Sequence, residues 1–175
     1  MENTEEFPFC IVGAGTVGSA LARLLVEAGW SFIGATSRSM KSARQACDFA
    51  GAGQAYENPA ELTASARLVL ITTPDDAIAG VCRQISDREG ITPHSVVAHC
   101  SGALDSGELA TAREAGASVG SFHPLQTFAT CQQAVEALPG SYCCLEGDEE
   151  AVKLLRSVAE AIGATPLTIP TEKKV

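Results

Sequence analysis

A glycine-rich turn between an apolar run and an amphipathic segment constrains this chain more than any other feature. Residues 9–18 read FCIVGAGTVG, and apolar residues then recur at one-face helical spacing as far as Ala28. Gly29 provides a helix stop. A buried strand, a G-x-G-x-x-G turn and a helix in this order predict a turn that approaches the diphosphate of a dinucleotide. A glycine turn that binds no ligand is the alternative.

The three glycines of this turn are expected to contribute in different ways. Gly13 permits the tight turn, Gly15 lets a diphosphate approach the backbone, and Gly18 allows the helix to pack closely on the strand. Free N–H groups at the start of the helix then face the phosphates. We therefore expect the diphosphate to be held by Gly13, Gly15, Thr16, Val17 and Gly18.

The rest of the chain alternates between short apolar runs and amphipathic segments. Strands are expected near residues 8–12, 30–36, 54–56, 67–73, 95–98, 118–122, 142–146 and 166–169. Helices are expected near 16–28, 40–50, 107–115 and 149–162, with others starting near 59 and after 74, and a helical turn or loop at 132–138. This alternation over 175 residues predicts one α/β domain, a doubly wound, mainly parallel Rossmann sheet with helices on both faces.

Two helix starts carry capping signals. Asn58 precedes Pro59, and Glu61 follows at the spacing of a capping box. Asp75 or Asp76 is expected to cap the helix that follows the strand at 67–73. These residues are assigned structural roles only.

The residues after the second predicted strand indicate which nicotinamide cofactor would bind. An NAD site has Asp or Glu here to bond the ribose hydroxyls, and this chain has neither. Ser37 and Arg38 follow Thr36 instead, and a guanidinium with a neighbouring hydroxyl suits a phosphate. NADP is therefore favoured over NAD, with Ser37 and Arg38 holding the 2′-phosphate. The alternative is that Arg38, together with Lys41 and Arg44, forms a solvated helix face.

Polar residues also follow the later strands, at the sheet edge where ligands bind in doubly wound folds. Thr73 and Pro74 are expected to flank the nicotinamide ribose. His123 is the first candidate for the proton transfer that accompanies hydride transfer, although it can equally shape the turn by bonding a carbonyl. His99 and Ser101 are candidates for substrate contact or for loop scaffolding.

Two other chemistries of this region are weaker alternatives. A metal site formed by His99, Cys100 and His123 matches no standard ligand spacing, so no metal is expected. Cys100 as a nucleophile beside His123 would need a lowered thiol pKa.

Composition excludes several classes of partner. The formal net charge is −9 and the pI about 4.7, which disfavours binding to nucleic acid or to an anionic membrane. The seven cysteines form no C-x-x-C pair, and their odd number indicates a reducing, cytoplasmic setting. No signal peptide is evident, and no apolar run reaches the length of a membrane span.

Several stretches together resemble one protein family. They are IVGAGTVG at 11–18, TPDD at 73–76, HCSGAL at 99–104, SFHPLQTF at 121–128 and EGD at 146–148. In this order they are similar to the amino-terminal half of the bacterial Rossmann-like/DUF2520 proteins. More distantly the chain resembles the 6-phosphogluconate dehydrogenase-like group, including pyrroline-5-carboxylate reductases, ketopantoate reductases and F420-dependent NADP reductases.

The resemblance implies an NADP-dependent oxidoreductase whose chain continues into a helical domain. In this group that domain makes the dimer and one wall of the substrate pocket. Residues 1–170 would then be the cofactor domain, and 171–175 the start of a linker to a helical domain that this chain lacks. The sequence does not identify the substrate.

Two functions of different classes follow. The first is hydride transfer between the nicotinamide and a C=O or C=N group of a small molecule, with the protein providing position and electrostatics. The second is NADP(H) binding without catalysis, as a sensor or regulatory module. The absence of an evident catalytic Lys or Asp constellation favours the second, and the resemblance favours the first.

Overall fold

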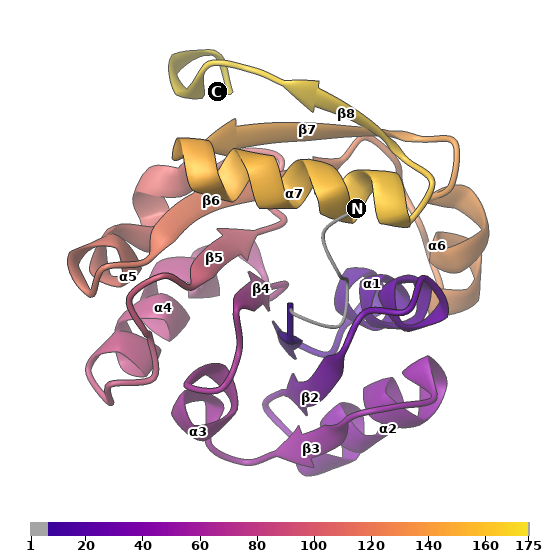
Figure 1. Ribbon diagram of the computed structural model, residues 1–175. Helices are drawn as coiled ribbons and strands as arrows, with labels where there is room; N and C mark the ends of the chain where they lie inside the picture. The colour runs from indigo at the N-terminus through magenta and orange to yellow at the C-terminus, as the bar shows by residue number, and fades with distance from the viewer. Residues whose placement is uncertain (1–6, 175) are drawn as a thin grey trace.

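The computed structural model describes residues 7–174 as a single eight-stranded sheet with helices on both faces (Figure 1). The strand order is β3-β2-β1-β4-β5-β6-β7-β8, and β7 runs antiparallel to β6 while the other neighbours are parallel. The strands are β1 (Phe9–Val12), β2 (Phe32–Thr36), β3 (Gln54–Tyr56), β4 (Leu68–Ile71), β5 (Val96–His99), β6 (Ser118–Pro124), β7 (Tyr142–Gly147) and β8 (Thr165–Thr168). The predicted doubly wound, mainly parallel α/β sheet is confirmed.

Helices follow most strands. The α-helices are α1 (Thr16–Glu27), α2 (Met40–Ala50), α3 (Pro59–Thr63), α4 (Ile78–Ser86), α5 (Ala110–Glu114), α6 (Cys131–Ala137) and α7 (Glu149–Ala161). Short 3₁₀ turns are η2 (Asp75–Ala77), η3 (Ser106–Leu109) and η4 (Thr171–Lys173). The strand at 118–122 was predicted too short, because β6 continues through His123 and Pro124 while paired to β7.

The sheet separates two hydrophobic cores. Within β1, Phe9 and Ile11 belong to the core under α1, α2, α6 and α7, while Cys10 and Val12 belong to the core under α3, α4 and α5. Because both faces are covered, the strands need no polar alternation, which is why they read as continuous apolar runs. Burying a single side chain of the size of Ile11 stabilises the fold by about 1.5–3 kcal/mol.

The predicted helix caps are only partly confirmed. The Asn58 side chain accepts a hydrogen bond from Ala60 N at 3.1 Å, as a cap should. Glu61 does not close a capping box on the backbone, because it accepts instead from the Asn58 side-chain amide at 3.1 Å. The capping role of Asp75 or Asp76 is wrong: η2 intervenes before α4, and neither element has a side-chain cap.

The parallel register aligns one row of residues across the middle of the sheet. Val12 of β1 pairs with Ile71 of β4, which pairs with His99 of β5. His99 pairs with Ser121 of β6, which pairs with Glu146 of β7. The row therefore changes from apolar to polar at β5.

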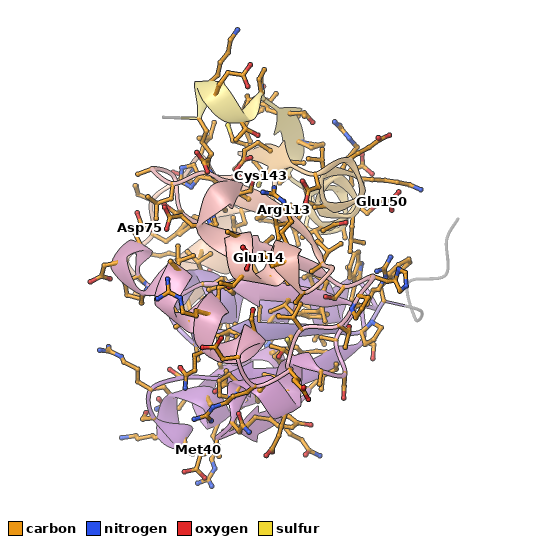
Figure 2. All side chains as sticks on the ribbon, turned by 90° about the vertical axis from the view of Figure 1, so that its left-hand side faces the viewer. Met40, Asp75, Arg113, Glu114, Cys143 and Glu150 are labelled. Atoms are coloured by element: carbon orange, nitrogen blue, oxygen red, sulfur yellow. The ribbon has the colours of Figure 1, made fainter. Side chains whose placement is uncertain are left out.

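The reversed direction of β7 changes where its following helix begins. Met40 begins α2 and Asp75 begins η2, each after a parallel strand, and both lie towards one side of the molecule in Figure 2, whereas Glu150 in the first turn of α7 lies on the other. The carboxyl ends of β1, β2, β4, β5 and β6 therefore share one edge without α7. No helix in the described part of the chain is long and apolar enough to cross a membrane.

Candidate dinucleotide site

A cleft of about 770 Å³ opens at the carboxyl ends of β1, β2 and β4. Six residues predicted to bind the cofactor line it: Gly13, Gly15, Ser37, Arg38, Thr73 and Pro74. Thr16, Val17 and Gly18 do not line it, and they form the first turn of α1 beside it. His99, Ser101 and His123 also lie outside the lining. The structure thus brings together most of the predicted cofactor residues and separates them from the predicted catalytic ones.

The three glycines of the turn have distinct surroundings. Gly13 has φ +112°, and a Cβ there would lie 2.7 Å from the backbone between Thr72 and Thr73. A Cβ on Gly18 would lie 2.5 Å from Gly13 O, so the helix can pack here only without a side chain. A Cβ on Gly15 would meet nothing within 4 Å. Packing therefore explains Gly13 and Gly18, whereas Gly15 leaves open space at the cleft.

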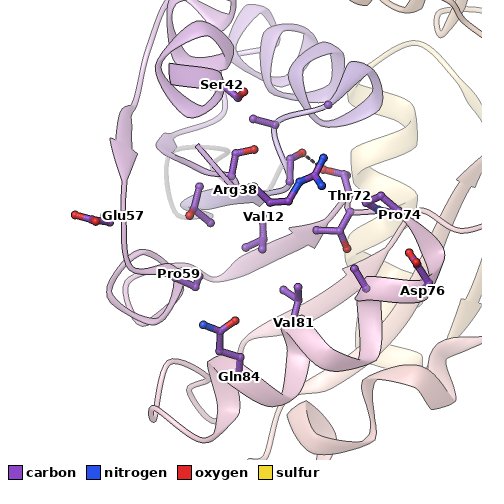
Figure 3. A pocket seen from close by; sticks show the side chains of 17 residues that line it. Val12, Arg38, Ser42, Glu57, Pro59, Thr72, Pro74, Asp76, Val81 and Gln84 are labelled. Atoms are coloured by element: carbon purple, nitrogen blue, oxygen red, sulfur yellow. Dashed lines mark hydrogen bonds between the residues drawn. The ribbon is translucent and has the colours of Figure 1, made fainter. Parts of the chain in front are cut away.

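Thr72 fastens the glycine turn to β4. Its hydroxyl donates to Gly13 O at 2.5 Å, and its backbone N–H donates to Val12 O at 2.8 Å (Figure 3). Thr72 was expected only as part of the strand at 67–73, and this hydrogen bond to the glycine turn was missed. A threonine directly after a central strand was the available signal.

The amino terminus of α1 is left without a side-chain cap. Gly15 occupies the cap position, and the first helical hydrogen bond runs from Ser19 N to Gly15 O at 2.9 Å. No acidic residue lies in the first turn. The first amide groups of a helix have no intrahelical partner and carry partial positive charge, so this end of the cleft favours an anion.

The Thr73 hydroxyl provides a second polar group without a partner. Its oxygen is buried, has no hydrogen-bond partner among the described residues, and belongs to a residue that lines the cleft. An unsatisfied buried polar group costs about 1–3 kcal/mol. A ligand oxygen in the cleft would remove that cost only if the Thr73 side chain turned its hydroxyl towards the cleft, because the oxygen itself is buried.

Arg38 supplies a cation at the far side of the cleft. It is exposed, and within residues 7–174 its guanidinium has no hydrogen bond or ion pair. The neighbouring helix α2 begins here, with Ser39 as its cap accepting from Ser42 N at 3.1 Å and with no acidic residue in its first turn. Glu57 and Asp76 also line the cleft, so its charge is mixed and the cationic part is local to the end of β2.

Helix α4 contributes a lining stripe that the sequence analysis missed. Val81 and Gln84 of α4 face the cleft (Figure 3), and Ala77, the last residue of η2, lines it at the same helical spacing. The stripe Ile78, Cys82 and Ile85 beside it is buried in the core. The two offset stripes were the signal, because a helix that buries one stripe can present the adjacent one to a ligand.

His99 is committed to the loop that follows β5. It is fully buried; its Nε2–H donates to Asp105 O at 2.9 Å, and its Nδ1 accepts from Ser101 N at 3.2 Å. Burial lowers its pKa, and the bond to Asp105 opposes that shift in part. Ser101 Oγ in turn accepts from Ala103 N and Leu104 N, both at 3.1 Å. For His99 and Ser101, the geometry supports loop scaffolding over substrate contact.

His123 has a different environment. It lies on β6, half-buried, and its Nδ1 lies 3.3 Å from Cys100 O. Its Nε2 has no hydrogen-bond partner among the described residues. Of the three predicted catalytic residues, His123 alone keeps a ring nitrogen available for a ligand.

The other chemistries weighed for this region are not supported. Burial raises the pKa of the Cys100 thiol to about 12, which keeps it protonated at neutral pH and unsuited to nucleophilic attack. Among residues 7–174, no group of three or more His, Cys, Asp or Glu side chains is arranged to hold a metal ion.

A buried polar cluster closes the sheet edge beyond β5. Glu146 accepts hydrogen bonds from Ser106 N at 2.7 Å, Ser106 Oγ at 2.9 Å and Thr171 Oγ1 at 3.0 Å. Lys174 Nζ lies 3.9 Å from Glu146 Oε1 and donates to Ser121 Oγ, with both charged side chains almost fully buried. Burial lowers the pKa of Lys174, and Glu146 opposes that shift. Residues 171–174, expected to begin a linker, thus pack against the sheet.

Comparison with known proteins agrees with this geometry. A family model described as a Rossmann-like domain matches residues 4–124, so the chain belongs to the Rossmann-like domain family. The matched residues include all those that line the cleft. No curated protein matches the chain.

Solved structures share the fold across nearly the whole chain. A Bacteroides fragilis protein described as a "putative NADP oxidoreductase" is 22% identical with TM-score 0.82, over 98% of this chain and 63% of that protein. Protein TM1727 of Thermotoga maritima is 27% identical with TM-score 0.70, over 95% and 58%. Arogenate dehydrogenase of Synechocystis is 19% identical with TM-score 0.81, over 95% and 61%. The chain therefore spans less than two thirds of each of these proteins.

Proposed function

We propose that this chain is the cofactor-binding domain of an NADP-dependent oxidoreductase. The observation that carries the proposal is the cleft itself, which is lined by Gly15 at an uncapped helix terminus, by Thr73 with its unpartnered buried hydroxyl and by Arg38 with its unpaired guanidinium. These groups fit a dinucleotide. The amides of Thr16 and Val17 would hold the diphosphate, and Thr73 with Pro74 would flank the nicotinamide ribose.

The preference for NADP rests on the end of β2. Ser37 and Arg38 would hold the 2′-phosphate, supported by the amino terminus of α2. A second arrangement that suits NAD would need a carboxylate directly after β2, and that position holds a serine. Glu57 follows β3 rather than β2.

The reaction class follows from what would adjoin the nicotinamide. The chemistry that a bound nicotinamide supplies is hydride transfer, here to or from a C=O or C=N carbon of a small molecule. The Nε2 of His123 would exchange the accompanying proton with the oxygen or nitrogen. Strand order supports this placement, because β5 and β6 follow β4 directly at the same edge.

A non-catalytic NADP(H) sensor is the second candidate, favoured by one observation. The polar groups beyond β5 largely satisfy each other, which leaves few groups within residues 7–174 to contact a substrate. From the family resemblance we infer that a helical domain completes the enzyme and forms a homodimer. From the cysteine content we infer that the protein works in the cytoplasm.

Calorimetric titration of this chain with NADPH and NADH tests the proposal. We expect binding of both, with NADPH tighter. If neither coenzyme binds at saturating concentration, the proposal is refuted. NADPH oxidation with a panel of keto acids and imines, measured on this chain and on a longer form with a helical domain, separates the candidates. Turnover only in the longer form favours the enzyme, and binding without turnover in both favours the sensor.

A further inference from the structure

The loop from Cys100 to Ser106 is held in one conformation by side chains that point into it. His99 bonds its two ends through Ser101 N and Asp105 O. Ser101 Oγ accepts from two amides of the same loop, and the Glu146 carboxylate holds Ser106 through two bonds. A loop with so many buried bonds is a rigid support for whatever rests on it.

The ring of His123 rests on this loop at Gly102. A Cβ at residue 102 would lie 2.6 Å from both Cε1 and Nε2 of His123 and 3.2 Å from Cδ2. Real Cβ atoms do not approach so closely, so the ring occupies this place only because residue 102 lacks a side chain. Gly102 does not have positive φ, so backbone conformation does not require glycine here.

The same placement determines which ring nitrogen of His123 carries the proton. Its Nδ1 lies 3.3 Å from Cys100 O, and a carbonyl oxygen can only accept. Nδ1 is therefore assigned the proton, and in the neutral ring Nε2 holds a lone pair. His99 has the opposite arrangement, because its Nε2 faces the carbonyl of Asp105 and its Nδ1 accepts from an amide.

We propose that Gly102 is a positioning residue that sets His123 on the loop as the Nδ1–H tautomer, leaving Nε2 to exchange a proton with the substrate. The role of Nε2 rests on the proposed function, whereas the tautomer and its dependence on Gly102 do not. For reduction of a C=O or C=N group, Nε2 of the neutral ring would first take up a proton from solvent. The protonated ring would pass this proton to the substrate oxygen or nitrogen as the carbon gains its hydride, and would return to the neutral Nδ1–H form. In the reverse direction Nε2 would accept the proton of the substrate O–H or N–H group.

Long-range proton–nitrogen NMR correlations of the three imidazoles test this proposal. In ¹⁵N-labelled protein at alkaline pH, where imidazoles are neutral, we expect a protonated Nδ1 for His123 and a protonated Nε2 for His99. His→Gln variants at 94, 99 and 123 assign the signals. A wild-type His123 that carries its proton on Nε2 would overturn the proposal without any further variant.

The Gly102→Ala variant tests the positioning itself. The three atoms nearest to the added Cβ all belong to the far end of the His123 side chain, so the protein should fold. We expect His123 to lose its pure Nδ1–H pattern while His99 keeps its own. Gly80→Ala is the matched control, because a Cβ there meets nothing within 4 Å, and both patterns should persist. An unchanged His123 tautomer in Gly102→Ala would refute the positioning role.

A separate measurement tests the proposed function. Calorimetric binding of NADPH by the wild-type chain tests the cofactor domain and does not depend on the tautomer. Tautomers as expected without NADPH binding would overturn the function alone. NADPH binding with a His123 ring indifferent to Gly102→Ala would overturn the positioning alone.

Discussion

Two stretches of the same sheet edge use polar groups in opposite ways. At β1, β2 and β4 the polar groups face a cleft, and the Thr73 hydroxyl and the Arg38 guanidinium have no partner within the described residues. At β5 to β7 the polar groups bond each other, with Glu146 accepting three hydrogen bonds in the interior. Both stretches read as polar residues after buried strands, so the sequence makes them look equivalent.

This difference indicates that the first stretch can bind a ligand and that the second supports the fold. A buried polar group without a partner lowers stability until a ligand satisfies it, and an exposed polar group beside a cleft stays available to a ligand. Groups that satisfy each other gain rigidity and leave little for a ligand. The two stretches should therefore respond differently to substitution, the first in coenzyme affinity and the second in stability.

Breaking the buried cluster should cost stability without loss of cofactor affinity. Glu146→Gln leaves Lys174 buried without its anion, which typically costs about 3–5 kcal/mol in unfolding free energy. Denaturant titration measures the cost, and calorimetry should show NADPH affinity unchanged. The double variant Glu146→Gln with Lys174→Met should recover part of the loss. A fall in NADPH affinity that exceeds the effect of lost folding would show that the two stretches act as one site.

Filling the open space at Gly15 should have the opposite effect, a loss of coenzyme affinity with little change in stability. Gly15→Val places a side chain where the diphosphate would lie, and we expect at least about a tenfold loss for both NADPH and NADH, or about 1.4 kcal/mol. Stability should change little, because nothing lies within 4 Å of the added Cβ. Gly80→Ala serves as the control for adding a Cβ into open space. Undiminished affinity in Gly15→Val would rule out the diphosphate position.

Removing the unpaired cation should discriminate between the two coenzymes. Arg38→Ala should weaken NADPH binding by about 1–3 kcal/mol, the range for losing a charge-assisted hydrogen bond, and leave NADH binding nearly unchanged. Arg44→Ala is the matched control, because Arg44 is exposed on α2, the helix that follows Arg38, and does not line the cleft. Equal losses for the two coenzymes in calorimetry would remove the phosphate assignment.

Because His99 is buried, it should make the stability of the protein depend on pH. Its pKa is lowered on folding by burial, so the unfolded chain binds the proton more tightly. Stability should therefore fall as pH drops below the unfolded value near 6.5. His99→Asn should have a shallower slope between pH 7.5 and 5.5 in denaturant titrations. His94→Asn, at an exposed residue with positive φ, should keep the wild-type slope. Identical slopes in all three proteins would contradict the buried neutral imidazole.

The residues that line the cleft could be grouped from sequence for a local reason. The glycine turn, the serine and arginine after β2, and the threonine and proline after β4 each follow a strand directly, and parallel strands bring their carboxyl ends together. Sequence position alone therefore placed Gly13, Arg38 and Thr73 at one cleft. The stripe of Val81 and Gln84 was missed, because which face of α4 meets the cleft depends on how the helix packs.

The region beyond β5 was not accessible in the same way. His99 and His123 looked alike in sequence, each following an apolar run, yet one is buried with both nitrogens bonded and the other keeps a free Nε2. Because β7 runs antiparallel to β6, Glu146 lies beside Ser121. The chain after β8 returns to the same place, where Lys174 contacts both side chains. These contacts join residues up to 53 positions apart.

Sequence by itself determined the alternation of strands and helices, the parallel sheet and the position of the glycine turn, because these depend on local periodicity and on strand ends that meet by topology. Only the tertiary structure decided which polar groups bond each other and which stay open to a ligand. Whether two distant residues form a hydrogen bond depends on differences of a few tenths of an ångström in the distance between donor and acceptor, and the packing of the whole sheet sets that distance.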